Sequence, residues 1–219
     1  MRILYYLPIF FLFTAFLCES DEPTEAIDPV IASLVAEPGE IVVEADGAVA
    51  TLTTVNAMSY YESGCEVDGE EVDRIRIWHQ QENADGTRLF LVLHVVKVEL
   101  GTLNNTLDPG LSCIQYSNFN SRIRLGLWFA EADGSVTESY YSDAELDSES
   151  FLELTEFVLP ECCDLPIFYG FAPDEDLFGY VSGNFDIMLY SSLTGEALRL
   201  RGVINLAPLI HAFETSPYL

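Results

Sequence analysis

Basic side chains are scarce in this sequence. Lysine and arginine together number nine against 36 aspartates and glutamates, so the formal net charge at pH 7 is −27. Lys97 is the only lysine. Nucleic-acid-binding proteins draw affinity from basic side chains that neutralise phosphates, so this composition argues against a nucleic-acid partner. Direct electrostatic binding to an anionic membrane surface is disfavoured for the same reason.

The local motifs of common catalytic sites are also missing. The chain contains no Gly-x-Ser-x-Gly turn, no His-Glu-x-x-His zinc motif and no glycine-rich phosphate loop. Its three histidines, His79, His94 and His211, are isolated from one another in the sequence. No nucleophile and base can be paired, and abundant acids alone do not identify the carboxylate pair of a glycosidase. We therefore predict that the protein is not an enzyme.

The first residues contain one long apolar run, which is too short for a membrane span. Arg2 is followed by 15 uncharged residues from Ile3 to Leu17, whereas a spanning helix needs about 20. A short basic start followed by such a run is typical of a signal peptide. The sequence thus predicts a signal peptide over residues 1–17 and an exported protein.

Cys18 follows the apolar run directly and resembles the acylated cysteine of bacterial lipoproteins. Leu17 stands where those families usually have a small residue, and cleavage after Ser20 is the alternative, which would give a secreted protein. We expect residues 18–40 to be a lipidated cysteine and an acidic, proline-containing spacer. Asp28 and Pro29 predict an N-cap and first position of a short helix within it.

Four further cysteines predict a disulfide framework, because exported proteins fold in oxidising compartments. They are Cys65, Cys113, Cys162 and Cys163. A bond between the adjacent Cys162 and Cys163 would close a strained ring, so each is expected to pair with Cys65 or Cys113. No metal site is predicted, since adjacent cysteines suit zinc poorly. We expect no cofactor; calcium is the one alternative, through acids such as those at positions 68–73.

Asp-Gly pairs divide the chain after residue 40 into segments rich in valine, isoleucine, threonine and aromatic residues. Asp-Gly tolerates the positive φ of tight two-residue turns. The hairpins expected are 41–45 with 49–55, 74–81 with 88–98, and 123–131 with 136–141. Residues 41–219 are therefore predicted to form a single all-β domain, an antiparallel β-sandwich of immunoglobulin-like or jelly-roll-like type, with a barrel as second choice.

Alternating apolar residues are clearest near the end of the chain. Val181, Phe185, Ile187 and Leu189 fall on one face, and Leu198, Leu200, Ile204 and Leu206 do the same after Thr194-Gly195. The Ser182-Gly183-Asn184-Phe185 strand and its partner, which carries Gly202, resemble the closing hairpin of uncharacterised β-sandwich surface lipoproteins of Bacteroidota. That resemblance, together with the acidic run after Cys18, implies a fold and a surface location but transfers no catalytic residue.

The scarce arginines are not evenly distributed. Six of them form three Arg-x-Arg pairs, Arg74/Arg76, Arg122/Arg124 and Arg199/Arg201. Residues two apart in a strand share a face, so Trp78 is expected beside Arg76 and Trp128 beside Arg124. Because the alternating positions in both segments are apolar, this Arg-Trp face is predicted to be the outer one. If the strands are neighbours, they create a cationic aromatic patch for an anionic glycan; the alternative is a scaffold in which arginines pair with acids across strands.

Together these patterns predict an outer-membrane or cell-surface lipoprotein, held at the membrane by its lipid. Its function is expected to be a non-catalytic binding or interaction module, with a glycan or an envelope protein as partner. A structural or assembly component of an envelope complex is the alternative, and a glycoside hydrolase is the third.

Overall fold

The computed structural model describes residues 28–53, 60–113, 120–158 and 179–211. These residues form one helix and twelve strands, so the all-β prediction is confirmed. The elements are α1 (Pro29–Ser33), β1 (Glu40–Ala45), β2 (Ala48–Thr53), β3 (Tyr60–Val67), β4 (Glu70–Glu82), β5 (Arg88–Val96), β6 (Gly101–Asn104), β7 (Leu111–Cys113), β8 (Ile123–Ala130), β9 (Val136–Ser142), β10 (Phe151–Val158), β11 (Gly179–Ser191) and β12 (Ala197–His211).

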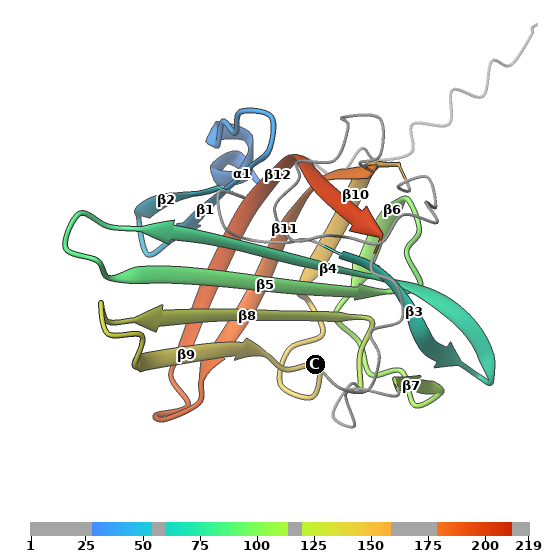
Figure 1. Cartoon of the computed structure of the whole chain (residues 1–219). Coiled ribbons are helices and arrows are strands. Elements are labelled where there is room, and N and C mark those ends of the chain that lie inside the picture. The colour runs from blue at the N-terminus through green and yellow to red at the C-terminus, as the bar shows by residue number, and fades with distance from the viewer. Residues whose placement is uncertain (1–27, 54–59, 114–119, 159–178, 212–219) are drawn as a thin grey trace, which may run out of the picture.

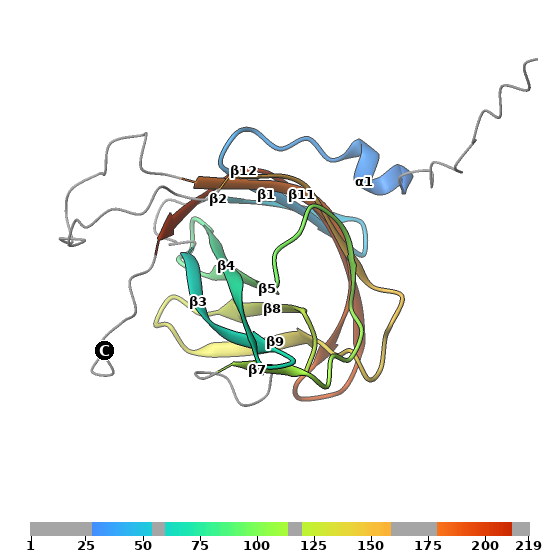
Figure 2. The same cartoon turned by 90° about the vertical axis from the view of Figure 1, so that its right-hand side faces the viewer.

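Eight strands close into an antiparallel barrel, which was the second choice of the sequence analysis rather than the sandwich. The ring runs β1, β2, β4, β5, β8, β9, β11, β12 and returns to β1. Strands β4, β5, β8 and β9 run side by side, and β11 and β12 cross behind them (Figure 1); a view turned by 90° shows the ring (Figure 2). The remaining strands extend the sheet beyond the ring: β10 and β6 beside β11, and β3 and β7 beside β4.

The hairpins follow the Asp-Gly turns. At Asp46 and Gly47, φ is 49° and 82°, and β1 and β2 pair on either side of this two-residue turn. Asp68 and Gly69 repeat this geometry between β3 and β4. Glycine and aspartate are among the residues that adopt positive φ most easily, so the turn chemistry fixes where these strands reverse. The three hairpins expected from the sequence are all present.

Inward-facing side chains from all parts of the ring fill the barrel as one apolar core. Its members include Ile41, Leu52, Ile75, Ile77, Leu91, Leu93, Ile123, Leu125, Phe185, Ile187 and Leu200. Phe185 lies over Gly202, its register partner on β12, and a Cβ on Gly202 would be 2.3 Å from the Phe185 ring. The glycine is therefore required by the close approach of that ring.

The alternation predicted in the last two strands holds for β11 and for the first half of β12. Leu200 and Ile204 are buried as expected, but Leu206 has a positive φ of 48° and is only partly buried. This irregularity shifts the alternation by one residue, so Ala207 and Leu209 are buried in its place. The expectation for Leu206 was wrong because a local backbone turn interrupts the period of two.

An ion cluster fixes α1 to the outside of the barrel. The Asp28 carboxylate accepts a hydrogen bond from the Val30 backbone N–H at 2.7 Å, as an N-cap does, and lies 3.5 Å from Arg201 Nε. Arg201 also contacts Glu44 at 3.1 Å, and Arg199 Nε donates to Asp186 at 2.7 Å. The third Arg-x-Arg pair therefore joins α1, β1, β11 and β12.

The disulfide framework differs from the expected connectivity. Cys65 on β3 is bonded directly to Cys113 on β7, and their Cα atoms are 4.1 Å apart. The two strands pair with these residues in register, which brings together cysteines 48 positions apart in the sequence. The prediction that Cys162 and Cys163 each reach back to one of them was wrong. Cys162 and Cys163, like Cys18, lie outside the described residues.

Candidate functional site

The two Arg-Trp strands lie on the same outer face of the barrel but are not adjacent. Strand β5 separates β4 from β8, and β9 follows β8. Register places Trp78 opposite Val92, and Val92 opposite Gly126, so even-numbered residues face outward on β4, β5 and β8. On β9, where Tyr141 lies opposite Gly126, the odd-numbered residues face outward. We call the outer side of β4, β5, β8 and β9 the Arg-aromatic face.

One row across this face carries the basic side chains. Arg76 on β4 is in register with His94 on β5, and His94 is in register with Arg124 on β8. Both arginines are partly exposed, whereas His94 is 8% exposed. We call these three residues the cationic row.

Burial and neighbouring charges both act on the imidazole of His94. Burial and the charges of Arg76, Arg74 and Arg124 together lower the pKa of His94 to about 3. His94 is therefore neutral at physiological pH. The row accordingly presents two guanidinium groups flanking a neutral imidazole, on a molecule whose overall charge is strongly negative.

A second row, next to the first, carries the aromatic rings. Trp78 on β4 lies beneath the Arg76 guanidinium, 5.1 Å from ring centroid to Cζ. Trp128 on β8 leans over Gly126, where a Cβ would be 3.2 Å from its ring. The Trp128 indole N–H donates to the Tyr141 hydroxyl at 2.6 Å. We call Trp78, Trp128 and Tyr141 the aromatic row.

The other predicted arginines have different surroundings. Arg74 is 2% exposed and stands in register with Val96 on β5 and Glu62 on β3, so it acts on this face through its charge. Arg122 precedes β8, and its Nε donates to the Asp108 carboxylate at 2.8 Å. Arg122 therefore fits the alternative interpretation of the sequence, in which arginines pair with acids as part of the scaffold.

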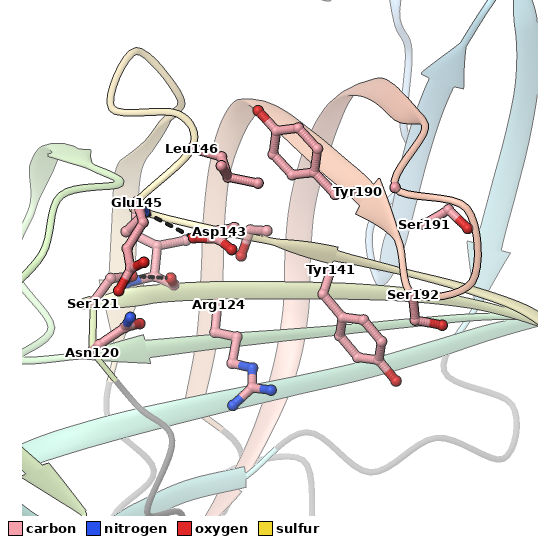
Figure 3. A pocket seen from close by; sticks show the side chains of 14 residues that line it. Asn120, Ser121, Arg124, Tyr141, Asp143, Glu145, Leu146, Tyr190, Ser191 and Ser192 are labelled. Atoms are coloured by element: carbon pink, nitrogen blue, oxygen red, sulfur yellow. Dashed lines mark hydrogen bonds between the residues drawn. The ribbon is translucent and has the colours of Figure 1, made fainter.

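A cleft of about 520 Å³ opens where the Arg-aromatic face meets the β11–β12 turn. Arg124 and Tyr141 project side by side at its edge (Figure 3), with the guanidinium 6.0 Å from the tyrosine ring centroid. Tyr190 and Leu146 also line it. The cationic and aromatic rows therefore continue into a concavity with mixed polar and apolar walls.

Two carboxylates, Asp143 and Glu145, line the same cleft. The Asp143 carboxylate accepts the Glu145 backbone N–H at 2.8 Å, and two further N–H groups bond to the Asp143 carbonyl. The Asp143 carboxylate therefore has a structural role in this turn, since aspartate side chains commonly accept a hydrogen bond from the backbone two residues further on. Among the described residues no group of three or more histidine, cysteine or acidic side chains is arranged to hold a metal ion.

His94, Gly126 and Tyr141 are the site residues that the sequence analysis missed. His94 was regarded as isolated because its neighbours come from two other strands. Counting by two through the 83–87 turn leads from Arg76 to His94, so this residue could have been found from the sequence. Tyr141 could not be found in this way, because a register irregularity at Phe129 and Ala130 shifts the outward positions of β9 by one residue.

Comparisons with protein-family models, curated proteins and solved structures each give no match. In the described part of the chain, no helix has the length and apolarity to cross a membrane. The function must therefore be argued from the geometry of the site.

Proposed function

We propose that this protein is a non-catalytic binding protein of the cell envelope whose Arg-aromatic face binds acidic glycans. Guanidinium groups pair with carboxylate or sulfate groups, and aromatic faces pack against sugar rings. Adjacent strands lie about 4.8 Å apart, so the aromatic row from β4 to β9 extends over about 14 Å. That length suits a chain of several sugar units better than a single ring.

One observation carries this proposal: the cationic row lies directly beside the aromatic row. Arg76 connects the two rows, because it is in register with His94 and its guanidinium lies over the ring of Trp78. Arg124 likewise is in register with His94 and faces the ring of Tyr141. A ligand with charged groups and rings in alternation would contact both rows at once.

The location proposed for this activity is the bacterial cell surface. It is supported by the apolar leader, by Cys18 and by the acidic spacer, as well as by the resemblance of the final hairpin to Bacteroidota surface lipoproteins. Lipid attached at Cys18 would hold the chain at the outer membrane, and cleavage after Ser20 would instead release it. Labelled palmitate on the wild type but not on Cys18→Ala distinguishes the two.

Calorimetric titration of the purified protein with oligomers of galacturonic acid, chondroitin sulfate and neutral cellulose tests the glycan proposal. We expect the acidic oligomers to bind at least tenfold more tightly than the neutral ones, with affinity falling as salt is raised. The double variant Trp78→Ala, Trp128→Ala should lose this binding, as should Arg76→Gln, Arg124→Gln. Arg88→Gln is the matched control, since Arg88 pairs with Glu82 at 3.4 Å beside the β4–β5 turn and belongs to neither row.

Equal binding by the wild type and the double tryptophan variant would show that the site lies elsewhere. Binding of no glycan would overturn the proposal in favour of the envelope-assembly alternative. The described sheet ends at β6 and β7, which have four and three residues. Such short edges restrict pairing with another chain, so the edges themselves do not favour that alternative.

A further inference from the structure

The aromatic row continues onto a further strand, where it enters the cleft described above. Tyr141 on β9 is in register with Tyr190 on β11, so both side chains lie on the outer side of the sheet. Both residues also line the cleft of about 520 Å³. In Figure 3 their rings lie between Glu145 and Leu146 on one side and Ser192 on the other. A chain that follows the aromatic row therefore passes over Tyr190 between the two walls of the cleft.

The charges beside this row follow a regular order. Arg76 on β4 and Arg124 on β8 each carry a guanidinium group. His94 on β5, between them, is uncharged at neutral pH, because burial and the neighbouring arginines lower its pKa to about 3. Continuing the β8–β9 register by two residues brings Arg124 level with Asp143, just after β9 ends. From β4 outward, the four positions are therefore a cation, a neutral group, a cation and a carboxylate.

The cleft end of this order is acidic. Asp143 and Glu145 both line the cleft. Burial and the charges of Asp147 and Asp143 raise the pKa of Tyr190, so its hydroxyl stays protonated at neutral pH. A carboxylate on a ligand would be repelled here, whereas a sugar hydroxyl can donate a hydrogen bond to a carboxylate. The cleft thus favours an uncharged sugar unit.

The separation of the two arginines favours acidic groups on every second sugar unit. Arg76 and Arg124 lie two strands apart, which is about 9.6 Å along the row. A pyranose unit in an extended chain advances by a length similar to the spacing between adjacent strands. A unit between the arginines therefore lies over His94, which supplies no charge. On a molecule of net charge −27, a carboxylate without a guanidinium partner is repelled.

We propose that the Arg-aromatic face and the cleft together bind a glycan in which acidic and uncharged sugar units alternate. Acidic units lie over Arg76 and Arg124, and an uncharged unit lies in the cleft over Tyr190. The alternating glycan is a narrower class of the acidic ligand proposed above, and its binding rests on that proposed function. Tyr190 and Glu145 are the residues that add this specificity, by packing against the uncharged unit and by repelling an acidic one.

Three synthetic hexagalacturonates with the same backbone test this pattern. One is fully acidic, one carries methyl esters on every second unit, and one is esterified throughout. Calorimetric titration at fixed salt measures their affinities for the purified protein. We expect the alternating hexamer to bind about threefold more tightly than the fully acidic one, as relief of one partly exposed repulsion provides, and the fully esterified one to bind most weakly. Attraction to the arginines alone would instead make affinity fall steadily with esterification.

Glu145→Gln locates the preference in the cleft. It removes a carboxylate that repels an acidic unit, so the affinities of the fully acidic and alternating hexamers should come within about twofold of each other. Glu149→Gln is the matched control, because Glu149 is an exposed glutamate nearby in the sequence that does not line the cleft. Tyr190→Ala should weaken binding of the alternating hexamer about fivefold, whereas Tyr180→Ala, near the other end of β11, should not.

The possible outcomes separate this proposal from the function on which it rests. Circular dichroism checks that each variant folds, and Glu145→Gln decides the question if Tyr190→Ala does not fold, because Glu145 is exposed. Equal or tighter binding of either uniform hexamer by the wild type would overturn the alternating pattern alone. A preference that Glu145→Gln and Glu149→Gln retain equally would do the same. Binding of no hexamer would overturn both proposals.

Discussion

Trp128 and Tyr141 form the most closely defined contact of the Arg-aromatic face. The indole N–H of Trp128 donates to the Tyr141 hydroxyl at 2.6 Å, and the two rings meet edge to face with centroids 5.7 Å apart. Gly126, in register with Tyr141, leaves the room that the indole occupies. The orientation of Trp128 therefore depends on residues of two strands.

Tyr141→Phe should loosen that orientation while keeping the ring. The variant removes the acceptor of the indole N–H, so we expect a loss of about 1 kcal/mol in the free energy of unfolding and weaker binding of acidic glycans. Urea denaturation measures the first, and calorimetry the second. Fluorescence in a Trp78→Phe background reports Trp128 alone; an emission spectrum identical to that of the Trp78→Phe parent would contradict the assigned hydrogen bond.

Gly202→Ala should destabilise the barrel by overpacking. The new Cβ would lie 2.3 Å from the Phe185 ring, which is fully buried and has little room to move. We expect a loss of about 1–3 kcal/mol, part of which Phe185→Leu restores because the smaller side chain gives way to the methyl group. A double-mutant cycle from chemical denaturation measures the coupling. Additive effects of the two substitutions would show that the ring does not rest on Gly202.

Arg201→Gln should cost far more stability than a similar change at an exposed ion pair. Arg201 is the partner of Glu44, which is 7% exposed, and also lies 3.5 Å from Asp28. Leaving a buried carboxylate without its cation is expected to cost about 2–3 kcal/mol. Arg88→Gln is the control, and loss of its exposed pair with Glu82 should cost less than about 1 kcal/mol. Equal unfolding midpoints for the two variants would refute the difference.

Stability should fall at acid pH partly through His79. This side chain is fully buried in the barrel, and burial lowers its pKa to about 4, only partly offset by the backbone of Gly39 and Trp78. The unfolded chain binds a proton at residue 79 near pH 6.5, whereas the folded chain does so only near pH 4. Between these two pH values protonation favours the unfolded chain, so the free energy of unfolding decreases as the pH falls from 6.5 towards 4. Relative to His79→Gln, the wild type should lose about 3 kcal/mol between pH 7 and pH 4.

Above pH 7, the free energies of unfolding of the wild type and of His79→Gln should differ by a constant amount. Residue 79 is then unprotonated in both the folded and the unfolded chain. Subtracting the curves removes the contribution of the acids, which titrate in both proteins. Parallel curves down to pH 4 would show that His79 does not titrate differently in the folded and unfolded chains.

The hairpins were predictable because their information is local. Asp46-Gly47 specifies a turn within two residues, and the apolar alternation on either side sets the register. Closure of the ring was not predictable in this way, since β1 pairs with β12 across more than 150 residues. The bond between Cys65 and Cys113 was unpredictable for the same reason, because it depends on the long-range pairing of β7 with β3.

The site was partly predictable for a related reason. The spacing of two placed Arg76 with Trp78, and Arg124 with Trp128, on outer faces, and the structure has them there. The order of the strands is a tertiary property, so the insertion of β5 between them could not be read from the spacing. His94 consequently entered the site from β5, which the sequence analysis had described only as one arm of a hairpin.

The pairing of β1 with β12 also determines when the barrel can close during synthesis of the chain. Strand β12 pairs with β11 on one side and β1 on the other, and it is the last described strand to leave the ribosome. A nascent chain that ends before Ala197 can form the local hairpins but leaves β1 and β11 with open edges. The barrel therefore cannot close until β12 has been synthesised, however early the local hairpins form.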